Sequence, residues 1–494
     1  MQWDWMVAPM SCFIESSGFA NAHFMSRLSR YLVMLIAAKA MLGTVGAFGL
    51  VGPLATWQTP RLGYDLNAPF PGGPVDIGEE YRFNVPVVFY GFTPDFLNYF
   101  GQKGVEEIDK AFEIINEVPA ASKVNLNDFT LTSQRVNHRA AALGLVDLKS
   151  FTMTLMMQEM GLGDPVRFVY TLRSRWIPPG GNPTNYYIIR RNYDPVTWRV
   201  TSFINGQLWT YPLVTDIDQI HSFVFTAPVD PLAFSGLMNA PVASGQSSGM
   251  LLFGGFWTGL TRDDVGGLRY IYRKDNYNVE NLPTNAVNTI GTGAWGPPPG
   301  TTNVVTNAFG SNVVVNVAVR AGKDKIQFKK VSNDSTFGVF EPFTNNFSDT
   351  YITNATPFEQ FLQRALPAPD ILFDVADIHS PGDDEDDFTA FEFALAWTNN
   401  DPNNGLTGNL GPGVVEPAGA GPGLVITFNG IGQMFWNVWP NFLSEVNRAG
   451  NVGFWWGSFD GTTNDPVVYP LGIEVTELER RVLRDDVGSP WGSP

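Results

Sequence analysis

The chain has 494 residues and a formal net charge of −17. Hydrophobic residues make up 44% and charged residues 16%, a balance typical of a folded, β-rich protein and not of a disordered one. Binding to a phosphate backbone needs a basic surface, so the acidic balance argues against nucleic acid as a partner. The length predicts two or three domains.

An apolar segment near the start has the features of an export signal. Arg27 and Arg30 precede the apolar stretch, and small residues follow it near Ala47 to Ala55. We interpret residues 25–55 as a signal peptide or a hydrophobic anchor, and residues 1–24 as an upstream extension of the reading frame.

The choice between cleavage and anchoring rests on Lys39, which would cost about 2.5–3.5 kcal/mol at the centre of a spanning helix. That cost favours cleavage, without deciding it. We expect an exported protein, at the cell surface, in the extracellular space or in the periplasm. The single cysteine, Cys12, precedes the signal, so the mature chain has no disulfide.

The first predicted elements are a strand over 80–90 (EYRFNVPVVFY) and an amphipathic helix over 105–116 (VEEIDKAFEIIN). A second helix is predicted over 148–160 (LKSFTMTLMMQEM), followed by Gly161 as a stop. Asn205-Gly206, within VTSFINGQLWTY, predicts a β-hairpin. A third helix is predicted over 262–272, with two aspartates in its first turn.

A Pro/Gly cluster, GTGAWGPPPG, predicts a linker over 286–302. Beyond it, residues 303–494 contain short apolar runs separated by Asn, Gly and Asp, such as DKIQFKKV and GLVITFNG. The pattern predicts an all-β, sandwich-like region of one or two domains.

The region before the linker resembles the matrixin branch of the metzincin zinc proteases. VEEIDKAFEIINEVP is similar to the family's first helix, and LTRDDVGGLRYIY is similar to its closing helix, L-S-x-D-D-I-x-G-I-x-x-L-Y. The resemblance implies an α+β metzincin-like domain over 56–285. The long segment between Asp164 and Met250 implies inserted β-hairpins.

The family's zinc motif, H-E-x-x-H-x-x-G-x-x-H, is degenerate here. Aligning MGLGDP with the end of that motif places Thr154, Leu155, Gln158, Gly161 and Asp164 at its five defined positions, so that only the glycine is kept. Met250 falls where the family has its methionine turn, although a core methionine explains it equally well. We therefore expect no zinc and no enzymatic activity.

Other chemistry-bearing residues give weaker signals. His138, His221 and His379 are scattered, which is typical of surface or hydrogen-bonded histidines. Glu159 is expected on a helix surface. The run DDEDD at 383–387 is expected to be a solvated loop. The segment DGTTND offers a candidate calcium site formed by Asp460, Thr462, Asn464 and Asp465.

Aromatic residues gather in the C-terminal part. These residues, Trp436, Trp439, Trp455 and Trp456, are interpreted as core, as a platform for stacking a glycan, or as a contact for a neighbouring subunit.

Together these features favour an exported, non-catalytic structural or binding protein that self-associates or binds a cell-surface partner. The alternatives are a secreted hydrolase with an unrecognised active site and a carbohydrate-binding protein.

Overall fold

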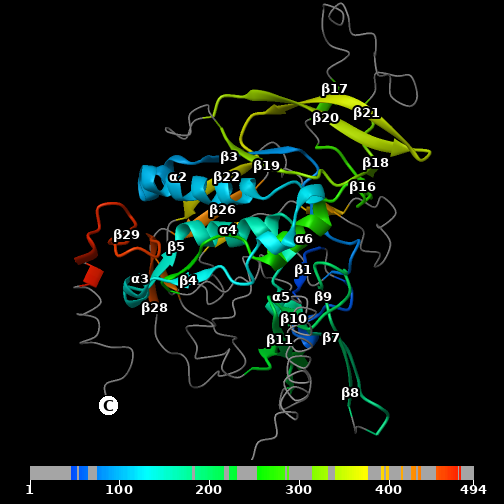
Figure 1. Cartoon of the computed structure of the whole chain (residues 1–494), viewed down its shortest axis with the longest axis horizontal. Coiled ribbons are helices and arrows are strands. Elements are labelled where there is room, and N and C mark those ends of the chain that lie inside the picture. Colours follow the sequence, from blue (N-terminus) through cyan, green and yellow to red (C-terminus); the bar gives the residue numbers. More distant parts are fainter. Residues whose placement is uncertain are drawn as a thin grey trace, which may run out of the picture. The chain divides into compact units, whose positions relative to one another are not determined.

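The structure is a computed structural model of the chain. The residues that it describes are 46–52, 55–64, 75–180, 184–215, 222–230, 253–283, 286–288, 314–331, 340–376, 391–393, 397–399, 413–415, 424–429, 432–434, 452–476 and 478–479. All of them belong to one compact unit, residues 46–494. The unit is mixed α/β, with several sheets and few helices (Figure 1).

The described part of the chain contains five α-helices: α2 (Pro94–Glu117), α3 (His138–Ala142), α4 (Leu148–Glu159), α5 (Pro165–Phe168) and α6 (Arg262–Tyr272). Short 3-10 turns lie at Pro60–Leu62, Ala121–Lys123 and Leu126–Asp128. The predicted second and third helices are confirmed, and the predicted first helix is part of the longer α2. Helix α2 is kinked at Gly101, whose backbone is not helical.

A largely parallel sheet lies at the centre of the unit. Its strand order is β19 (Gln327–Lys330), β3 (Val87–Phe92), β22 (Ile371–Ala376), β26 (Leu424–Asn429) and β23 (Phe391–Phe393), and only β23 is antiparallel. The runs VVFYGF, ILFDVA and LVITFN are mostly apolar, as expected for strands covered on both faces.

Helix α2 follows β3 and covers this sheet, and α4 packs on α2 (Figure 1). The contact is aromatic: the rings of Phe92 and Phe96 are 4.9 Å apart, and both pack near Phe373 of β22. The rings of Phe100 and Phe428 are 5.8 Å apart. The largest buried cluster of the described residues is built around these rings.

A second five-stranded sheet is antiparallel, in the order β16 (Asn278–Glu280), β18 (Ala318–Arg320), β20 (Phe343–Thr353), β21 (Thr356–Leu366) and β17 (Ala286–Asn288). Strands β20 and β21 form a long hairpin with Asn354 and Ala355 at its turn, both with positive φ. A third sheet contains β27 (Gly432–Met434), β28 (Val452–Ser458) and β29 (Val467–Val468), and β5 (Leu145–Asp147) runs parallel to β28.

The remaining strands form small sheets. These are β6 (Leu162–Gly163), β1 (Phe48–Leu50) and β9 (Asn192–Tyr193); β10 (Phe203–Ile204), β11 (Gln207–Thr210) and β14 (Ala227–Pro228); β12 (Leu213–Thr215) and β13 (Ser222–Val224); β15 (Gly255–Trp257) and β4 (Gln134–Val136); β2 (Tyr81–Arg82), β25 (Gly413–Val415) and β24 (Trp397–Asn399); and β7 (Thr171–Trp176) and β8 (Asn185–Ile189). The predicted hairpin at Asn205-Gly206 is confirmed as β10–β11.

The predicted boundary at 286–302 does not separate the strands that the structure describes. Strand β17 lies inside the predicted linker and pairs with β21, while residues 289–302 lie outside the described ranges. Strands β19, β22 and β26, from the predicted all-β region, join β3 in one sheet. The sequence pattern indicates that a segment is a strand, but not which distant strand pairs with it.

Part of the segment predicted as a signal or anchor belongs to the folded unit in the structure. Residues 25–45 lie outside the described ranges, but Phe48–Leu50 form β1, a fully buried central strand that pairs with β6 and β9. The sequence on both sides of residue 46 is apolar, so hydropathy alone does not show where β1 begins. No helix in the described ranges is long and apolar enough to cross a membrane.

Candidate functional site

Helix α4 carries three of the five positions aligned above with the zinc motif, and Asp147 caps its first turn. The Asp147 carboxylate accepts hydrogen bonds from the backbone N–H of Ser150 at 3.0 Å and from the Ser150 hydroxyl. Ser150 Oγ in turn accepts a bond of 2.7 Å from the backbone N–H of Trp257. Burial raises the pKa of Asp147 to about 6. Ten of the twelve residues of α4 are buried, so the helix is a core element.

Two motif positions, Thr154 and Gln158, lie one helical turn apart and are 5% and 7% exposed. The Thr154 hydroxyl donates to the Ser150 carbonyl at 3.2 Å, within the helix itself. Gln158 Oε1 has no hydrogen-bond partner in the described part of the chain. Leu155 is buried among the core side chains.

Gly161 ends α4 in a conformation that a larger residue resists. Its φ is +101°, and an added Cβ would lie 2.2 Å from the carbonyl oxygen of Tyr81. The motif glycine is therefore required by the turn itself, independently of any metal.

Asp164 caps the short helix α5. Its Oδ1 accepts from the backbone N–H groups of Val166 at 2.9 Å and Arg167 at 3.3 Å. Burial raises the pKa of Asp164 to about 7, although these two bonds oppose the rise. Met250 lies outside the described ranges. No group of three or more His, Cys, Asp or Glu side chains suited to a metal ion occurs among the residues that the structure describes.

Glu159 is placed differently from the prediction. It was expected on the helix surface, but it is 1% exposed, and its Oε2 has no hydrogen-bond partner among the described atoms. Burial raises its pKa well above the ordinary value. The prediction failed because α4 is covered on nearly all sides, a property that its sequence period does not reveal.

Helix α6 begins with two buried aspartates, of which one caps the helix and the other binds two distant backbone N–H groups. Asp264 forms a capping box with Thr261, whose backbone N–H it binds at 2.8 Å. Asp263 Oδ2 accepts from the backbone N–H groups of Ala47 at 2.7 Å and Asn205 at 2.6 Å. Asp263 thus ties the strand β1 region and the β10–β11 turn to α6. Its Oδ1 has no hydrogen-bond partner within the described ranges.

The candidate calcium residues, Asp460, Thr462, Asn464 and Asp465, lie together in an exposed loop. Asp460 Oδ1 already accepts from the backbone N–H of Thr462 at 2.8 Å and from its hydroxyl, bonds that lower the pKa of Asp460. Asp465 is paired with Arg139, which also binds Glu479 at 3.0 Å. The Arg139 guanidinium therefore lies beside the Asp465 carboxylate, where the predicted calcium ion would bind.

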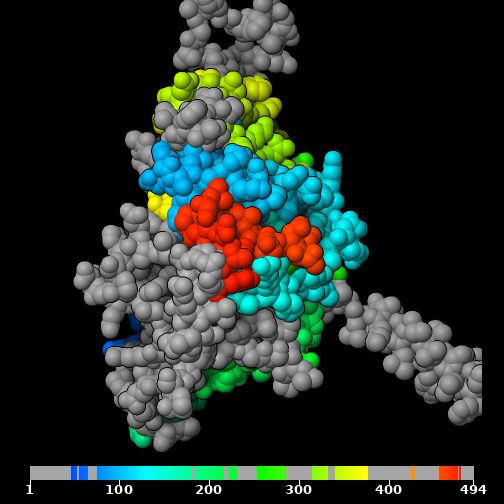
Figure 2. Space-filling model, turned by 90° about the vertical axis from the view of Figure 1, so that its left-hand side faces the viewer, coloured from blue at the N-terminus to red at the C-terminus, as the bar shows by residue number. Residues whose placement is uncertain are grey.

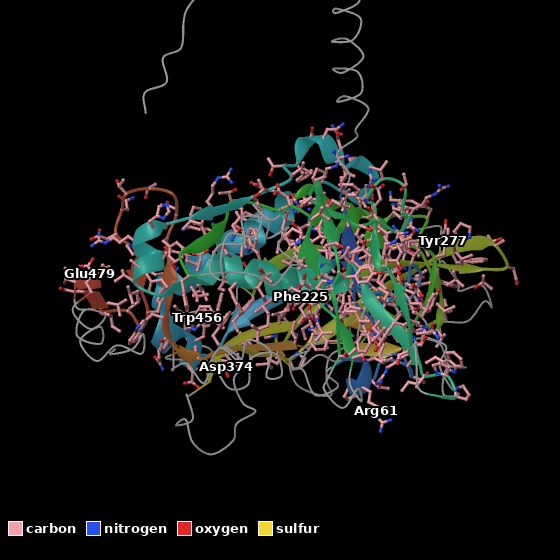
Figure 3. The ribbon with its side chains drawn as sticks, turned by 90° about the horizontal axis from the view of Figure 1, so that it is seen from below. Arg61, Phe225, Tyr277, Asp374, Trp456 and Glu479 are labelled. Atoms are coloured by element: carbon pink, nitrogen blue, oxygen red, sulfur yellow. The ribbon has the colours of Figure 1, made fainter. Side chains whose placement is uncertain are left out.

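The predicted binding aromatics do not form one surface in the described part. Trp436 and Trp439 lie outside it, and Trp455 packs half-buried against a small cluster. Trp456 is fully buried, with its ring 5.2 Å from Phe428 and 5.3 Å from Phe151, so it cannot stack on a ligand (Figure 3). A run of aromatics marks a core as readily as a surface.

The three most exposed aromatic residues of the described part were not predicted from the sequence. Trp176 is 57% exposed, Tyr187 61% and Tyr277 55%. Tyr277 lies beside the sheet that contains β16 (Figure 3), and the other two lie on the β7–β8 hairpin. The alternation in TLRSRW could have pointed to Trp176, since its strand places every second side chain outward.

A small cavity of about 30 Å³ lies at the C-terminal end of α2, beside Met160, Tyr272 and Lys325. It has room for about one water molecule. Lys325 Nζ donates to the carbonyls of Asn116, at 2.6 Å, and Val118, so it satisfies the end of α2. Burial lowers the pKa of Lys325. The role of Lys325 in the structure is therefore to cap the C-terminal end of α2.

Comparisons of the chain with protein-family models, with curated proteins and with solved structures find no match.

Proposed function

We propose that the chain is an exported, non-catalytic structural or binding protein, which self-associates or binds a protein at the cell surface on a scaffold resembling a zinc protease. The observation that carries the proposal is the state of the motif positions on α4. Thr154 and Gln158 stand where the resemblance implies two imidazoles, and both are buried, with the threonine hydroxyl bonded to its own helix.

The donor set does not fit zinc. Protein zinc sites use thiolate, imidazole and carboxylate ligands, and a neutral carboxamide or a threonine hydroxyl is a poor substitute. Asp164 is the one carboxylate among the three ligand positions, and its Oδ1 accepts from two backbone N–H groups of α5. Leu155, at the position of the general base, cannot transfer a proton.

Support for the scaffold comes from the order of the elements. Strand β3 leads into α2, α4 ends at the strained Gly161, and α6 opens with a capping box at Thr261. The hairpins β7–β8 and β10–β11 fall in the segment where the resemblance implies insertions. The metzincin-like arrangement belongs to the proposal. So does the sandwich-like arrangement of the later strands, for which the antiparallel sheet of β20 and β21 is the support.

Restoring the ligands tests both halves of the proposal. We expect the purified wild-type chain to hold no stoichiometric zinc and to cleave no peptide, with or without a chelator. The variant Thr154→His/Gln158→His/Asp164→His should gain one zinc per chain if α4 and its turn have the geometry that the resemblance implies. Circular dichroism checks that the variant folds, and Thr154→His alone is the matched control, because one imidazole cannot hold zinc tightly.

Two results would contradict the proposal. Peptide cleavage by the wild-type chain that a chelator abolishes would favour the secreted hydrolase. A folded triple variant without zinc would remove the support for the scaffold.

A further inference from the structure

The folded unit begins beside a buried carboxylate. Gly46 is the first residue of the compact unit, and the backbone N–H of the next residue, Ala47, donates to Asp263 Oδ2 at 2.7 Å. Ala47 is fully buried and Asp263 is only 2% exposed. The backbone nitrogen of Ala47 is therefore held on one carboxylate of helix α6.

One oxygen of this carboxylate is unpartnered. The N–H groups of Ala47 and Asn205 both bind Oδ2, and Oδ1 has no hydrogen-bond partner among the described atoms. No ion pair joins Asp263 to a cation within the described ranges. An ionised carboxylate that is buried without a positive partner is costly, so burial raises the pKa of Asp263 to about 8. A positive charge beside Asp263 would therefore stabilise its ionised form.

Gly46 borders the unpartnered oxygen. A Cβ built on Gly46 would lie 1.8 Å from Asp263 Oδ1, so a residue with a side chain does not fit here. The Cα of Gly46 therefore lies against Oδ1, where a methylene forms at best a weak hydrogen bond. If the chain began at Ala47, its nitrogen would carry three hydrogens and a positive charge, and this side of Oδ1 would be open.

The sequence allows an export leader to end at this position. A leader ends after small residues one and three positions before the cut. For a cut before Ala47, these residues are Gly46 and Thr44. Cuts before Met41 and before Phe48 fit the same rule, so the sequence alone does not choose among the three. Only the cut before Ala47 gives the nitrogen beside Asp263 a positive charge.

We infer that a leader peptidase cuts the chain between Gly46 and Ala47, and that the new α-ammonium group of Ala47 forms a buried ion pair with Asp263. The inference rests on the proposed function, because the cut accompanies export. The reaction is hydrolysis: water adds to the Gly46 carbonyl, the C–N bond breaks, and the leader leaves with a carboxylate. Ala47 keeps the amine, which takes up a proton below its ordinary pKa of about 8.

The chain from Ala47 onward keeps the described core. Phe48 and Leu50 of β1 belong to the largest buried cluster. Figure 2 shows α2, in light blue, beside the C-terminal strands, in red, and the rings of Phe100 and Tyr469 are 5.0 Å apart. The contact between the Ala47 nitrogen and Oδ2 is already formed, so the cut adds a charge to a nitrogen that is in place. Little rearrangement is needed for the ion pair to form.

The first residue of the exported protein tests the position of the cut. The full chain is expressed in a secreting host, and mass spectrometry of the exported protein identifies its N-terminal peptide. We expect that peptide to begin at Ala47. A protein that begins at Met41 or Phe48, or that keeps the segment before Gly46, overturns the inference and leaves export standing. If the chain is not exported, the export in the proposed function and the inference both fall.

The pH dependence of stability tests the ion pair. The charged groups that act on Asp263 are Asp264 and Arg262, both of α6 itself, while β1 and the β10–β11 turn present backbone N–H groups. The mature chain is compared with a control chain that begins at Thr44, in which the Ala47 nitrogen is an amide. In the control, the contribution of protonated Asp263 to stability is lost as the pH rises above its ordinary pKa of 3.8.

In the mature chain the ammonium keeps Asp263 ionised, so this loss does not occur. The urea midpoint of the mature chain, relative to the control, should therefore rise between pH 4 and pH 7. Asp263→Asn, made in both chains, should remove this dependence on pH, because no carboxyl then titrates at this position. Unfolding curves followed by circular dichroism also check that all four proteins fold.

Reactivity of the α-amino group is an independent readout. In the folded mature chain, acetic anhydride should modify the Ala47 amine at least about tenfold more slowly than in urea, because a buried amine reacts only when the structure opens. An amine that reacts equally fast in both states overturns the ion pair. So does a difference between the mature and control chains that stays constant from pH 4 to pH 7.

Discussion

Arg320 and Asp349 form a completely buried ion pair, in which the Arg320 Nε lies 3.0 Å from each carboxylate oxygen of Asp349. The pair joins β18 to β20. The other guanidinium nitrogens donate to backbone carbonyls, including those of Asn316 and Val315, at 2.9 Å each. Gln360 of β21 donates to Asp349 at 2.9 Å, so the carboxylate is bound from both neighbouring strands.

Asp349→Asn should lower the free energy of unfolding by about 3–5 kcal/mol, because it leaves the buried Arg320 charge without its counter-ion. Urea unfolding followed by circular dichroism measures the loss. Lys110→Ala, which breaks the exposed pair with Glu107, is the control and should change little. Equal losses in the two variants would show that the buried pair is not what holds β18, β20 and β21 together.

Asp263 should make the fold less stable as the pH rises. Burial raises its pKa to about 8, and the neighbouring Asp264 carboxylate adds to the rise, while the bonds from Ala47 and Asn205 oppose it. The folded state then holds a proton that the unfolded state has released above its ordinary pKa of 3.8. The stabilising contribution is full below that value and is lost as the pH rises through the folded pKa, with a slope of at most about 1.4 kcal/mol per pH unit.

Asp263→Asn keeps the acceptor oxygen for both N–H groups and removes the titration. Unfolding free energies measured between pH 5 and pH 9 should fall less steeply for this variant than for the wild type. Asp263→Ala, which removes the acceptor of the buried Ala47 N–H and the partly buried Asn205 N–H, should lose about 1–3 kcal/mol at every pH. Parallel pH curves for the wild type and Asp263→Asn would contradict the assignment of the titration to this residue.

Trp456→Ala should cost about 3–5 kcal/mol of unfolding free energy, since it empties a large volume among Phe428, Phe151 and Phe100. Trp176→Ala should leave the stability nearly unchanged, because the side chain is mostly exposed. Chemical denaturation of both variants compares a core tryptophan with a surface one. A large loss of unfolding free energy for Trp176→Ala would mean that the β7–β8 hairpin is part of the stable core.

Gly161→Ala should destabilise the fold by about 2 kcal/mol or more, through the positive φ and the clash with the Tyr81 carbonyl. Gly472→Ala is the matched control, because Gly472 has the same φ of +101° and open space around it. Differential scanning calorimetry of the two variants should give the lower melting temperature for Gly161→Ala. Equal melting temperatures would show that the contact with the Tyr81 carbonyl does not destabilise the variant.

Local features were predictable where the signal is local. Helix α4 begins at a capping aspartate and α6 at a capping box, and Asn205-Gly206 sets a turn with positive φ at both residues. The parallel sheet was not predictable in the same way, because β3 pairs with strands more than 200 residues later in the sequence. The mostly apolar run of β26, in GLVITFNG, was the available signal, and it was interpreted as a strand of a sandwich-like region.

In the candidate site, too, the local features were predictable from the sequence and the long-range ones were not. The motif spacing predicted that Thr154 and Gln158 share one side of α4, which follows from the helical period. The burial of Glu159 and Trp456 depends on what covers them, and those covering elements come from distant parts of the chain. The exposed face of the β7–β8 hairpin was not predicted, because Trp176 and Tyr187 are far enough apart in the sequence that only the pairing of β7 with β8 places them side by side.

The pairing of β3 with β19 also determines when β3 can complete its sheet during synthesis of the chain. Strand β3 cannot be completed until residues 327–330 have been synthesised, which at roughly 5–20 residues per second takes tens of seconds after β3 itself is made. Strand β5 waits still longer, for residues 455–457. During that interval both strands have an unpaired edge, and an unpaired strand edge is a site where another chain can pair.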